Sequence, residues 1–376
     1  MSWQSELACW LLRRQVRPKT LVPEIDVQGT RALAERRRLF PTRVPTGWRL
    51  HACYGATDAP RGEWLEPVTG RAALTLLYFH GGGYYFCSPT THRPLAFALT
   101  AKARARSFSV DYRLAPEAPF PAAHEDALAA YAALLEARVD PAMIVLGGDS
   151  AGGGLALALL VALRDRGAPL PAGAVLFSPW TDLAATGESL RSNDGTDPMF
   201  SGAALGRAAR LYVGDASPTD PYVSPLYADL AGLPPLLIQA GSTEVLLDDS
   251  RRFAERARAS GVEVDLQVWP RMPHVWQMAV PFMPEARRAL DDAAAFVRVV
   301  TAPPREAQGR CCMHRPIRYV ALVKFTYLVS INAIHCQMLD HSHSIVAGGF
   351  PDMSYTTRLI PCTSLIMRFE ARPNNA

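Results

Sequence analysis

Short apolar runs alternate with helix-like segments between residues 74 and 300, and this alternation limits the chain to few folds. Continuous apolar strands that alternate with helices predict a mostly parallel central sheet with helices on both faces, which is an α/β fold. Functional groups in such sheets gather beyond the carboxyl ends of the strands. The predicted strands are 74–79, 107–110, 143–146, 173–178, 235–240 and 264–269, and the predicted helices are 92–105, 122–137, 151–166 and 249–260.

Two segments fall outside this alternation. Residues 1–45 have the pattern of an amphipathic helix, because their large apolar residues recur at helical spacing. Residues 183–215 are a Gly-, Ser- and Ala-rich insertion between two predicted strands. We expect both segments to form a helical cap over the crevice of the main α/β domain at 46–300. The apolar residues of the first segment are Trp3, Leu7, Trp10 and Leu11.

The composition changes behind the sequence TAPP at 301–304. The tail carries eight Lys+Arg and four Asp+Glu of the chain's 39 and 35, which leaves 31 of each in residues 1–300. It shows no clear helical or strand period, so we predict that 301–376 is a non-native or disordered extension. Its cysteines and histidines match no trusted zinc-site spacing, which favours incidental residues over a metal site. They are Cys311, Cys312, His314, His335, Cys336, His341 and His343.

Several classes of protein are disfavoured. Because residues 1–300 are formally neutral, their net charge does not indicate binding to nucleic acid or to an acidic membrane surface. The seven cysteines are odd in number and contain no C-x-x-C pair, which suits a reducing compartment. The N-terminus lacks a signal-peptide pattern, and no apolar stretch reaches the length of a membrane span. We therefore expect a cytoplasmic protein without stable membrane insertion.

The run GGDSAGGG at 147–154 lies between a predicted strand and an apolar helix. Residues 148–152 match G-x-S-x-G, and the strand–helix context is what a nucleophile elbow requires. The flanking glycines let strand and helix approach closely while the turn lifts Ser150 into the crevice. The alternative is a phosphate-binding turn, but the glycine and lysine spacings of the nucleotide-binding motifs are absent. We predict that Ser150 is a nucleophile.

A second glycine-rich turn, HGGG at 80–83, follows the strand at 74–79. Backbone N–H groups in such a loop can approach the oxyanion of an acyl-transfer intermediate closely. We predict Gly82 and Gly83 as two donors and Ala151, directly after the nucleophile, as the third. Chain order argues against His80 as the base, so we predict that its side chain holds this loop by hydrogen bonds.

The base and the acid should follow the nucleophile in the chain. His274 is the one histidine between Ser150 and residue 300, and it lies beyond the last apolar strand. We therefore predict that it is the general base. The acid must lie between the two, after a strand, and GSTEVLLDDS at 241–250 meets both conditions. This stretch holds three carboxylates, Glu244, Asp248 and Asp249, and the latter two precede a helix-like segment whose first turn they would stabilise.

Together these pieces resemble the hormone-sensitive lipase family of α/β-hydrolases, the bacterial family IV esterases. The resemblance covers about residues 70–298 and depends on several motifs that occur in the family's order. They are HGGG at 80–83, DYRLAPE at 111–117, GDSAGG at 148–153, SPWTDL at 178–183, DPYVSPLYADLAGLPPLLIQAG at 220–241 and MPHVW at 272–276.

The resemblance implies an α/β-hydrolase fold and a serine carboxylesterase that acts on short- to medium-chain acyl esters. Glu244 aligns with the family's acid position, which is more commonly an aspartate, so the implied triad is Ser150, His274 and Glu244. Such an enzyme needs no metal or organic cofactor. Its implied partner is a small-molecule ester, without nucleic acid, and a homodimer is compatible with the family.

Two other functions use the same fold. An amidase or deacetylase would carry the same triad, and the sequence does not separate these activities from an esterase. A non-catalytic ligand-binding homologue is the other class, and the plant hormone receptor that resembles this family lacks the catalytic histidine. Because Ser150, a carboxylate and His274 are all present here, the sequence favours the enzyme.

Overall fold

The computed structural model describes residues 1–36, 43–55, 59–70, 72–302, 344–345 and 355–356. Residues Met1–Gln308 form one compact unit and Gly309–Ala376 a second one. In the second unit, two short strands, β9 (Ser344–Ile345) and β10 (Tyr355–Thr356), pair antiparallel. The rest of the predicted extension from residue 303 onward, including its cysteines and histidines, lies outside the described residues.

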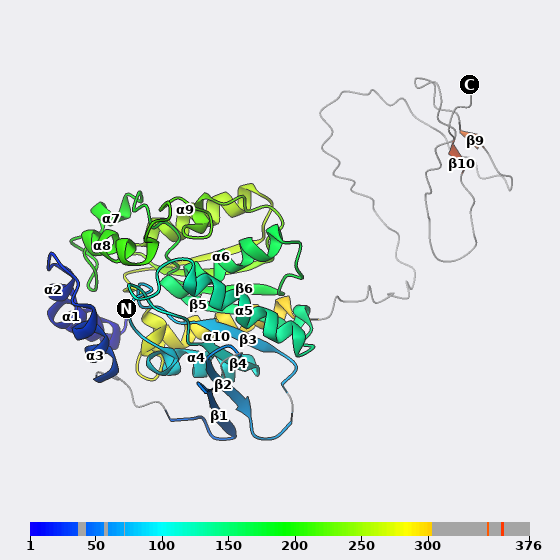
Figure 1. Ribbon diagram of the computed structural model, residues 1–376, viewed down its shortest axis with the longest axis horizontal. Helices are drawn as coiled ribbons and strands as arrows, with labels where there is room; N and C mark the ends of the chain where they lie inside the picture. Colours follow the sequence, from blue (N-terminus) through cyan, green and yellow to red (C-terminus); the bar gives the residue numbers. More distant parts are fainter. Residues whose placement is uncertain (37–42, 56–58, 71, 303–343, 346–354, 357–376) are drawn as a thin grey trace, which may run out of the picture. The chain divides into compact units, whose positions relative to one another are not determined.

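The first unit is built around an eight-stranded sheet with the order β1-β2-β4-β3-β5-β6-β7-β8 (Figure 1). β2 runs antiparallel to β1 and β4, and the remaining neighbours are parallel. All six predicted strands are confirmed as β3 to β8. The strands are β1 (Trp48–Cys53), β2 (Gly62–Pro67), β3 (Thr75–Phe79), β4 (Arg106–Val110), β5 (Ile144–Asp149), β6 (Gly173–Phe177), β7 (Leu236–Gly241) and β8 (Val264–Trp269).

Helices cover both faces of this sheet (Figure 1). α4 (Pro89–Ala103) and α10 (Pro284–Val300) form one apolar core with the sheet, and α5 (Ala122–Glu136), α6 (Ala151–Asp165) and α9 (Leu247–Ala259) form the other. Successive residues of a strand enter opposite cores: Ile144 and Leu146 lie in one, and Val145 lies in the other. Because both faces are buried, the central strands are apolar without interruption.

The N-terminal helices lie beside the insertion that follows β6 (Figure 1). Arg17 donates hydrogen bonds to the carbonyl oxygens of Asp197 and Phe200, and the Ser201 hydroxyl donates to the carbonyl of Thr20. The two segments that were predicted to form a cap therefore contact each other. Their helices are α1 (Trp3–Gln15), α2 (Arg17–Thr20), α3 (Val27–Arg36), α7 (Ser189–Ser192) and α8 (Gly202–Val213). Three short 3-10 helices are η1 (Pro141–Met143), η2 (Pro225–Tyr227) and η3 (Trp276–Ala279).

Helix α1 presents its apolar stripe to the solvent. Trp3 is 65% exposed and Trp10 is 51% exposed, whereas the buried residues of the helix are Ser5 and Cys9. The helix itself was predicted, but an amphipathic helix ordinarily packs its apolar face against the core.

Among the described helices, none combines the length and apolar content that a membrane crossing requires.

Candidate active site

Ser150 occupies the turn between β5 and α6, at the carboxyl edge of the sheet. Its φ of 52° and ψ of −122° lie outside the regions that L-residues normally adopt, as expected of a nucleophile elbow. The strained turn is held by two hydrogen bonds, from Ser150 N to Phe177 O (2.8 Å) and from Trp180 N to Ser150 O (2.9 Å). A side chain at Gly152 would overlap the carbonyl oxygen of Phe79, so only glycine lets α6 approach β3 this closely.

Glu244 and His274 form a buried pair beyond β7 and β8. The loop after β7 carries Glu244, and the loop after β8 carries His274. Their side chains meet in a hydrogen bond of 2.7 Å between His274 Nδ1 and Glu244 Oε2, and both side chains are buried. A carboxylate accepts and does not donate, so this bond places the proton of a neutral imidazole on Nδ1. The lone pair of Nε2 is then available for a proton from a nucleophile.

The pKa of His274 is raised above the ordinary value of 6.5 for histidine. Burial of the ring is the largest single influence and acts to lower this pKa, but the charge and hydrogen bond of Glu244 oppose it. The more distant charges of Asp197 and Asp149 act in the same direction as Glu244. The site therefore favours an imidazolium, which is the species that a general base becomes during proton transfer.

Two further groups fix the Glu244 carboxylate. The Ser178 hydroxyl donates to Glu244 Oε1 at 2.7 Å, and the N–H of Gly241 also donates to this oxygen. Ser178 Oγ in turn accepts a bond of 3.3 Å from the N–H of Val275, next to the base. Sequence reasoning missed Ser178, although its position directly after β6, at the carboxyl edge of the sheet, could have indicated it.

The insertion after β6 reaches the base through Phe200. The rings of Phe200 and His274 meet edge to face with centroids 5.2 Å apart. Asp197, also in the insertion, accepts a hydrogen bond of 2.8 Å from the N–H of Val245, which directly follows Glu244. Since Arg17 of α2 bonds the carbonyls of Asp197 and Phe200, the N-terminal region is linked to the Glu244–His274 pair. Nothing in the periodicity of residues 183–215 pointed to these contacts.

The HGGG turn folds into a tight loop after β3. Gly82 has a φ of 116°, and a side chain there would overlap the carbonyl oxygen of Phe86, so glycine is required. In the hydrogen bonds of the described residues, the N–H groups of Gly82, Gly83 and Ala151 donate to no backbone carbonyl. These three groups can therefore serve as donors to a ligand.

His80 lies beneath this loop, as the sequence predicted. Its Nδ1 is 2.7 Å from the carbonyl oxygen of Gly81, and its ring stacks on Tyr112 with centroids 4.3 Å apart. Burial, followed by the nearby His92, lowers the pKa of His80 to about 3. The imidazole is thus neutral at physiological pH and holds the loop through its hydrogen bond.

Asp149, the residue before Ser150, is a buried carboxylate that sequence reasoning did not single out. It accepts a hydrogen bond of 2.7 Å from the Tyr78 hydroxyl and lies 3.2 Å from Nε2 of His92. Burial alone would raise the pKa of Asp149, but His92 and Tyr78 hold it below its ordinary value. Its Oδ2 also lies against Gly81, so this carboxylate connects the elbow with the HGGG loop.

Asp248 and Asp249 lie in the first turn of α9, as predicted, but their partners differ from those expected. Asp248 Oδ2 accepts from the N–H of Ser189, and Asp249 Oδ2 accepts from the N–H groups of Thr181 and Asp182, all at 2.8 Å. Both carboxylates thus hold the segment after β6 rather than the N–H groups of their own helix. Burial, together with the charge of Asp182, raises the pKa of Asp249 to about 8.

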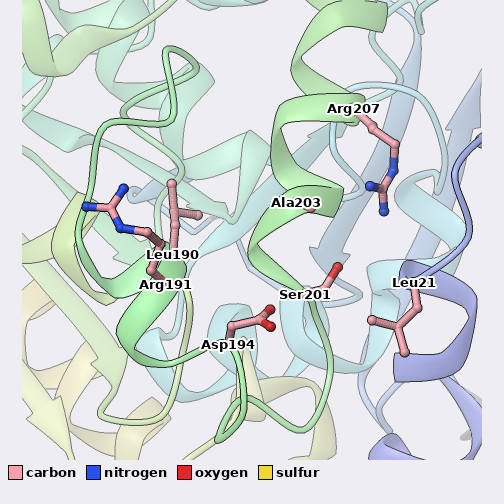
Figure 2. Close-up of a pocket in the computed structure, with 7 residues that line it drawn as sticks. All are labelled: Leu21, Leu190, Arg191, Asp194, Ser201, Ala203 and Arg207. Carbon is pink, nitrogen blue, oxygen red and sulfur yellow. The ribbon is translucent and has the colours of Figure 1, made fainter.

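A cavity of about 440 Å³ lies where the N-terminal helices meet the insertion (Figure 2). Its lining residues come from the end of α2, from α7 with the segment behind it, and from α8. None of Ser150, Glu244 and His274 lines it. The residues around it are Leu21, Leu190, Arg191, Asp194, Ser201, Ala203 and Arg207.

The structure brings the predicted acid and base together and leaves the nucleophile unbonded. Within the described part of the chain, Nε2 of His274 has no hydrogen-bond partner, and the Ser150 hydroxyl makes no bond to it. Hydrogen bonds between nucleophile and base are often long until substrate binds.

The described residues contain no group of three or more His, Cys, Asp or Glu side chains that could hold a metal ion.

Comparison with known proteins shows that the chain is similar to hydrolases. Residues 76–278 match a family model described as an α/β-hydrolase fold. The chain is 48% identical to an acetyl-hydrolase of Streptomyces hygroscopicus over 239 residues, which are 64% of this chain and 80% of that protein. It is 42% identical to an esterase of Acinetobacter venetianus over 260 residues, which are 69% and 84% of the two chains.

A solved structure agrees with these relatives. The crystal structure of an esterase from the bacterial hormone-sensitive lipase family superposes with a TM-score of 0.74 at 41% sequence identity. The superposition covers 80% of this chain and 99% of that one. The likeness therefore extends over the whole of the solved esterase.

Proposed function

The chain belongs to the hormone-sensitive lipase family of α/β-hydrolases and is a carboxylic ester hydrolase, and we propose that it acts through Ser150, His274 and Glu244. The proposed substrates are short- to medium-chain acyl esters. The acetyl-hydrolase relative, whose name specifies the smallest acyl group of this class, supports that choice. The observation that carries the proposal is the buried 2.7 Å bond from His274 Nδ1 to Glu244, which leaves Nε2 free for Ser150.

In the first half of the reaction, Ser150 Oγ attacks the ester carbonyl carbon while His274 Nε2 accepts the hydroxyl proton. Glu244 stabilises the resulting imidazolium through Nδ1. The carbonyl oxygen becomes an oxyanion that accepts hydrogen bonds from the N–H groups of Gly82, Gly83 and Ala151. The tetrahedral intermediate then collapses as His274 returns the proton to the leaving alkoxide, and an acyl-enzyme remains.

In the second half, water replaces the alcohol. His274 takes a proton from this water as it attacks the acyl carbon, and the same three N–H groups stabilise the second oxyanion. Collapse releases the carboxylic acid and returns the proton to Ser150. All proton transfers in this scheme use one nitrogen atom of His274, so the orientation of its ring by Glu244 is required in both halves.

The substrate class is tested by the rate of hydrolysis of p-nitrophenyl esters that differ in acyl length. We expect kcat/KM for butyryl esters to exceed that for palmitoyl esters roughly tenfold or more, because a site for short acyl groups would leave the longer apolar tail in water or would have to displace side chains to bury it. Measuring the same series on a chain that ends at residue 300 also tests the predicted extension. A large loss of solubility or activity on truncation would show that residues 301–376 belong to the fold. A preference for palmitoyl esters in the acyl series would contradict the proposed substrates.

The pH dependence of kcat/KM should follow the titration of His274. The base must be neutral to accept a proton, so activity is low at acid pH and rises with pH through the pKa of His274. Because this pKa is raised, we expect the midpoint above 6.5. Glu244→Gln removes the charge that opposes burial, so the residual activity of this variant should have a lower midpoint. An unchanged midpoint would contradict the assignment of His274 as the titrating base.

We also propose that the protein works in a reducing compartment such as the cytoplasm. The cysteines of the described residues, Cys9, Cys53 and Cys87, are free thiols. Thiols of this kind persist where cellular reductants prevent the formation of disulfides.

A further inference from the structure

The outward stripe of α1 consists of Trp3, Leu7, Trp10 and Leu11, and nothing in the proposed catalytic mechanism uses it. The four side chains recur at helical spacing and are between 38% and 65% exposed. Leu21 and Val22, directly after α2, extend the exposed apolar surface along the chain. A gathering of large apolar side chains on the outer side of a soluble protein marks an interaction surface.

Contacts outside Leu7, Trp10 and Leu11 hold the helix on the protein. At its start, the N–H and hydroxyl of Ser2 donate to the two carboxylate oxygens of Glu285 at 2.6 and 2.7 Å. At its end, Arg13 donates to the carbonyl of Thr196 at 2.9 Å, and Arg17 bonds the insertion. Polar contacts at both ends, an edge-to-face contact between Trp3 and Phe282 (centroids 5.6 Å apart) and the packing of Ala8 against the core therefore fix α1 with Leu7, Trp10 and Leu11 facing outward.

Basic side chains outnumber acidic ones in the segment that carries the stripe. Residues 1–22 contain four cationic side chains, Arg13, Arg14, Arg17 and Lys19, against one acidic side chain, Glu6. The Arg14 guanidinium lies over the Trp10 ring, 4.8 Å from its centroid, so a cation sits directly on the apolar surface. Arg17 is paired with Asp194 at 3.7 Å, which leaves Arg13, Arg14 and Lys19 against Glu6. This local excess of positive charge is concealed by the formal neutrality of residues 1–300 as a whole.

We propose that the outward stripe of α1 docks the protein on the surface of a lipid bilayer that contains anionic headgroups. Tryptophan is the residue that favours the boundary between headgroups and acyl chains. A helix with an apolar side of Trp and Leu, flanked by Arg and Lys, lies in the plane of that boundary and is attracted by anionic lipid. The protein binds such a surface peripherally and reversibly through this helix.

A second copy of the chain is a less suitable occupant. Stable protein interfaces use roughly 20–30 residues on each side. The outward stripe with Leu21 and Val22 supplies six apolar side chains. Two such strips provide too little surface for a stable dimer, whereas a bilayer can surround each side chain individually.

The test is co-sedimentation of the full chain with large unilamellar vesicles. We expect binding to vesicles of phosphatidylcholine mixed with phosphatidylglycerol, weaker binding to pure phosphatidylcholine, and loss of binding at high salt. The double variant Leu7→Gln/Trp10→Gln should lower the partition coefficient about tenfold or more, because two apolar side chains no longer enter the bilayer. Arg14→Gln/Lys19→Gln should reduce the difference between the two kinds of vesicle.

Val299→Gln is the matched control, since Val299 is 73% exposed and lies at the other end of α10 from Glu285. All variants should retain the thermal midpoint and the rate with soluble p-nitrophenyl acetate, because the stripe is outside the catalytic site. Several results would overturn the proposal: no binding of the unaltered chain, equal binding to both vesicles, or binding that survives Leu7→Gln/Trp10→Gln. Self-association that this double variant abolishes, without any vesicle binding, would assign the stripe to a second copy instead. Vesicle binding and self-association do not depend on the proposed triad, so Ser150→Ala protein should bind vesicles normally.

Discussion

Replacing Ser150 by Ala is expected to lower kcat for p-nitrophenyl acetate at least about 10⁴-fold. The hydroxyl is the atom that would form the acyl-enzyme, and no neighbouring group in the turn can replace it. Alanine keeps the Cβ atom, so it adopts the strained φ of 52° at the same cost as serine and the fold should persist. The measurement is steady-state hydrolysis with active-site concentration determined by titration of the unaltered enzyme.

Ser192→Ala is a suitable control for this substitution. Ser192 is an exposed residue of α7, and its removal should leave kcat unchanged. Retention of most of the activity in Ser150→Ala would contradict the assignment of the nucleophile. It would also reopen the amidase and ligand-binding alternatives, which p-nitroacetanilide hydrolysis and direct ligand binding would then separate.

The second large effect is expected at Glu244. Glu244→Ala should lower kcat about 10³-fold or more, because His274 loses both the partner that fixes its tautomer and the charge that stabilises its imidazolium. Asp248→Ala should retain kcat and lower the free energy of unfolding by about 1 kcal/mol, since it removes one hydrogen bond to the N–H of Ser189. Steady-state kinetics and thermal unfolding of the two variants distinguish these outcomes. The reverse pattern would assign the acid to Asp248.

The sheet was predictable wherever both of its faces are buried. The runs that became β3, β5, β6 and β7 consist almost wholly of apolar residues and glycine because their successive side chains enter two different cores, whereas β4 (RSFSV) and the edge strand β8 (VDLQVW) mix polar with apolar residues. β1 and β2 were not predicted, since the sequences WRLHAC and GEWLEP mix charged with apolar residues. β1 is the edge strand and β2 pairs antiparallel with β1 and β4, and partial exposure of both strands removes the continuous apolar pattern.

The proposed catalytic residues were predicted from local sequence, but their supporting contacts were not. A strand, a glycine-rich turn and a helix are contiguous in the chain, and this pattern predicted Ser150 as the nucleophile. Ser178 and Phe200 reach the Glu244–His274 pair from segments that are distant in the sequence and show no period. The orientation of α1 depends on contacts with distant residues, such as those of Ser2 with Glu285 and of Trp3 with Phe282, so helical spacing alone could not identify the side that faces the protein.

Covalent labelling of the nucleophile, combined with burst kinetics, tests the proposed mechanism most directly. The enzyme would be mixed with a fluorophosphonate, which reacts with activated serine nucleophiles, and the adduct would be located by peptide mass spectrometry. The mechanism predicts one adduct per chain on Ser150, strongly reduced labelling in His274→Ala, and a matching burst of p-nitrophenolate when a p-nitrophenyl ester is used. An adduct on another residue, or turnover without any covalent intermediate, would contradict the proposed mechanism.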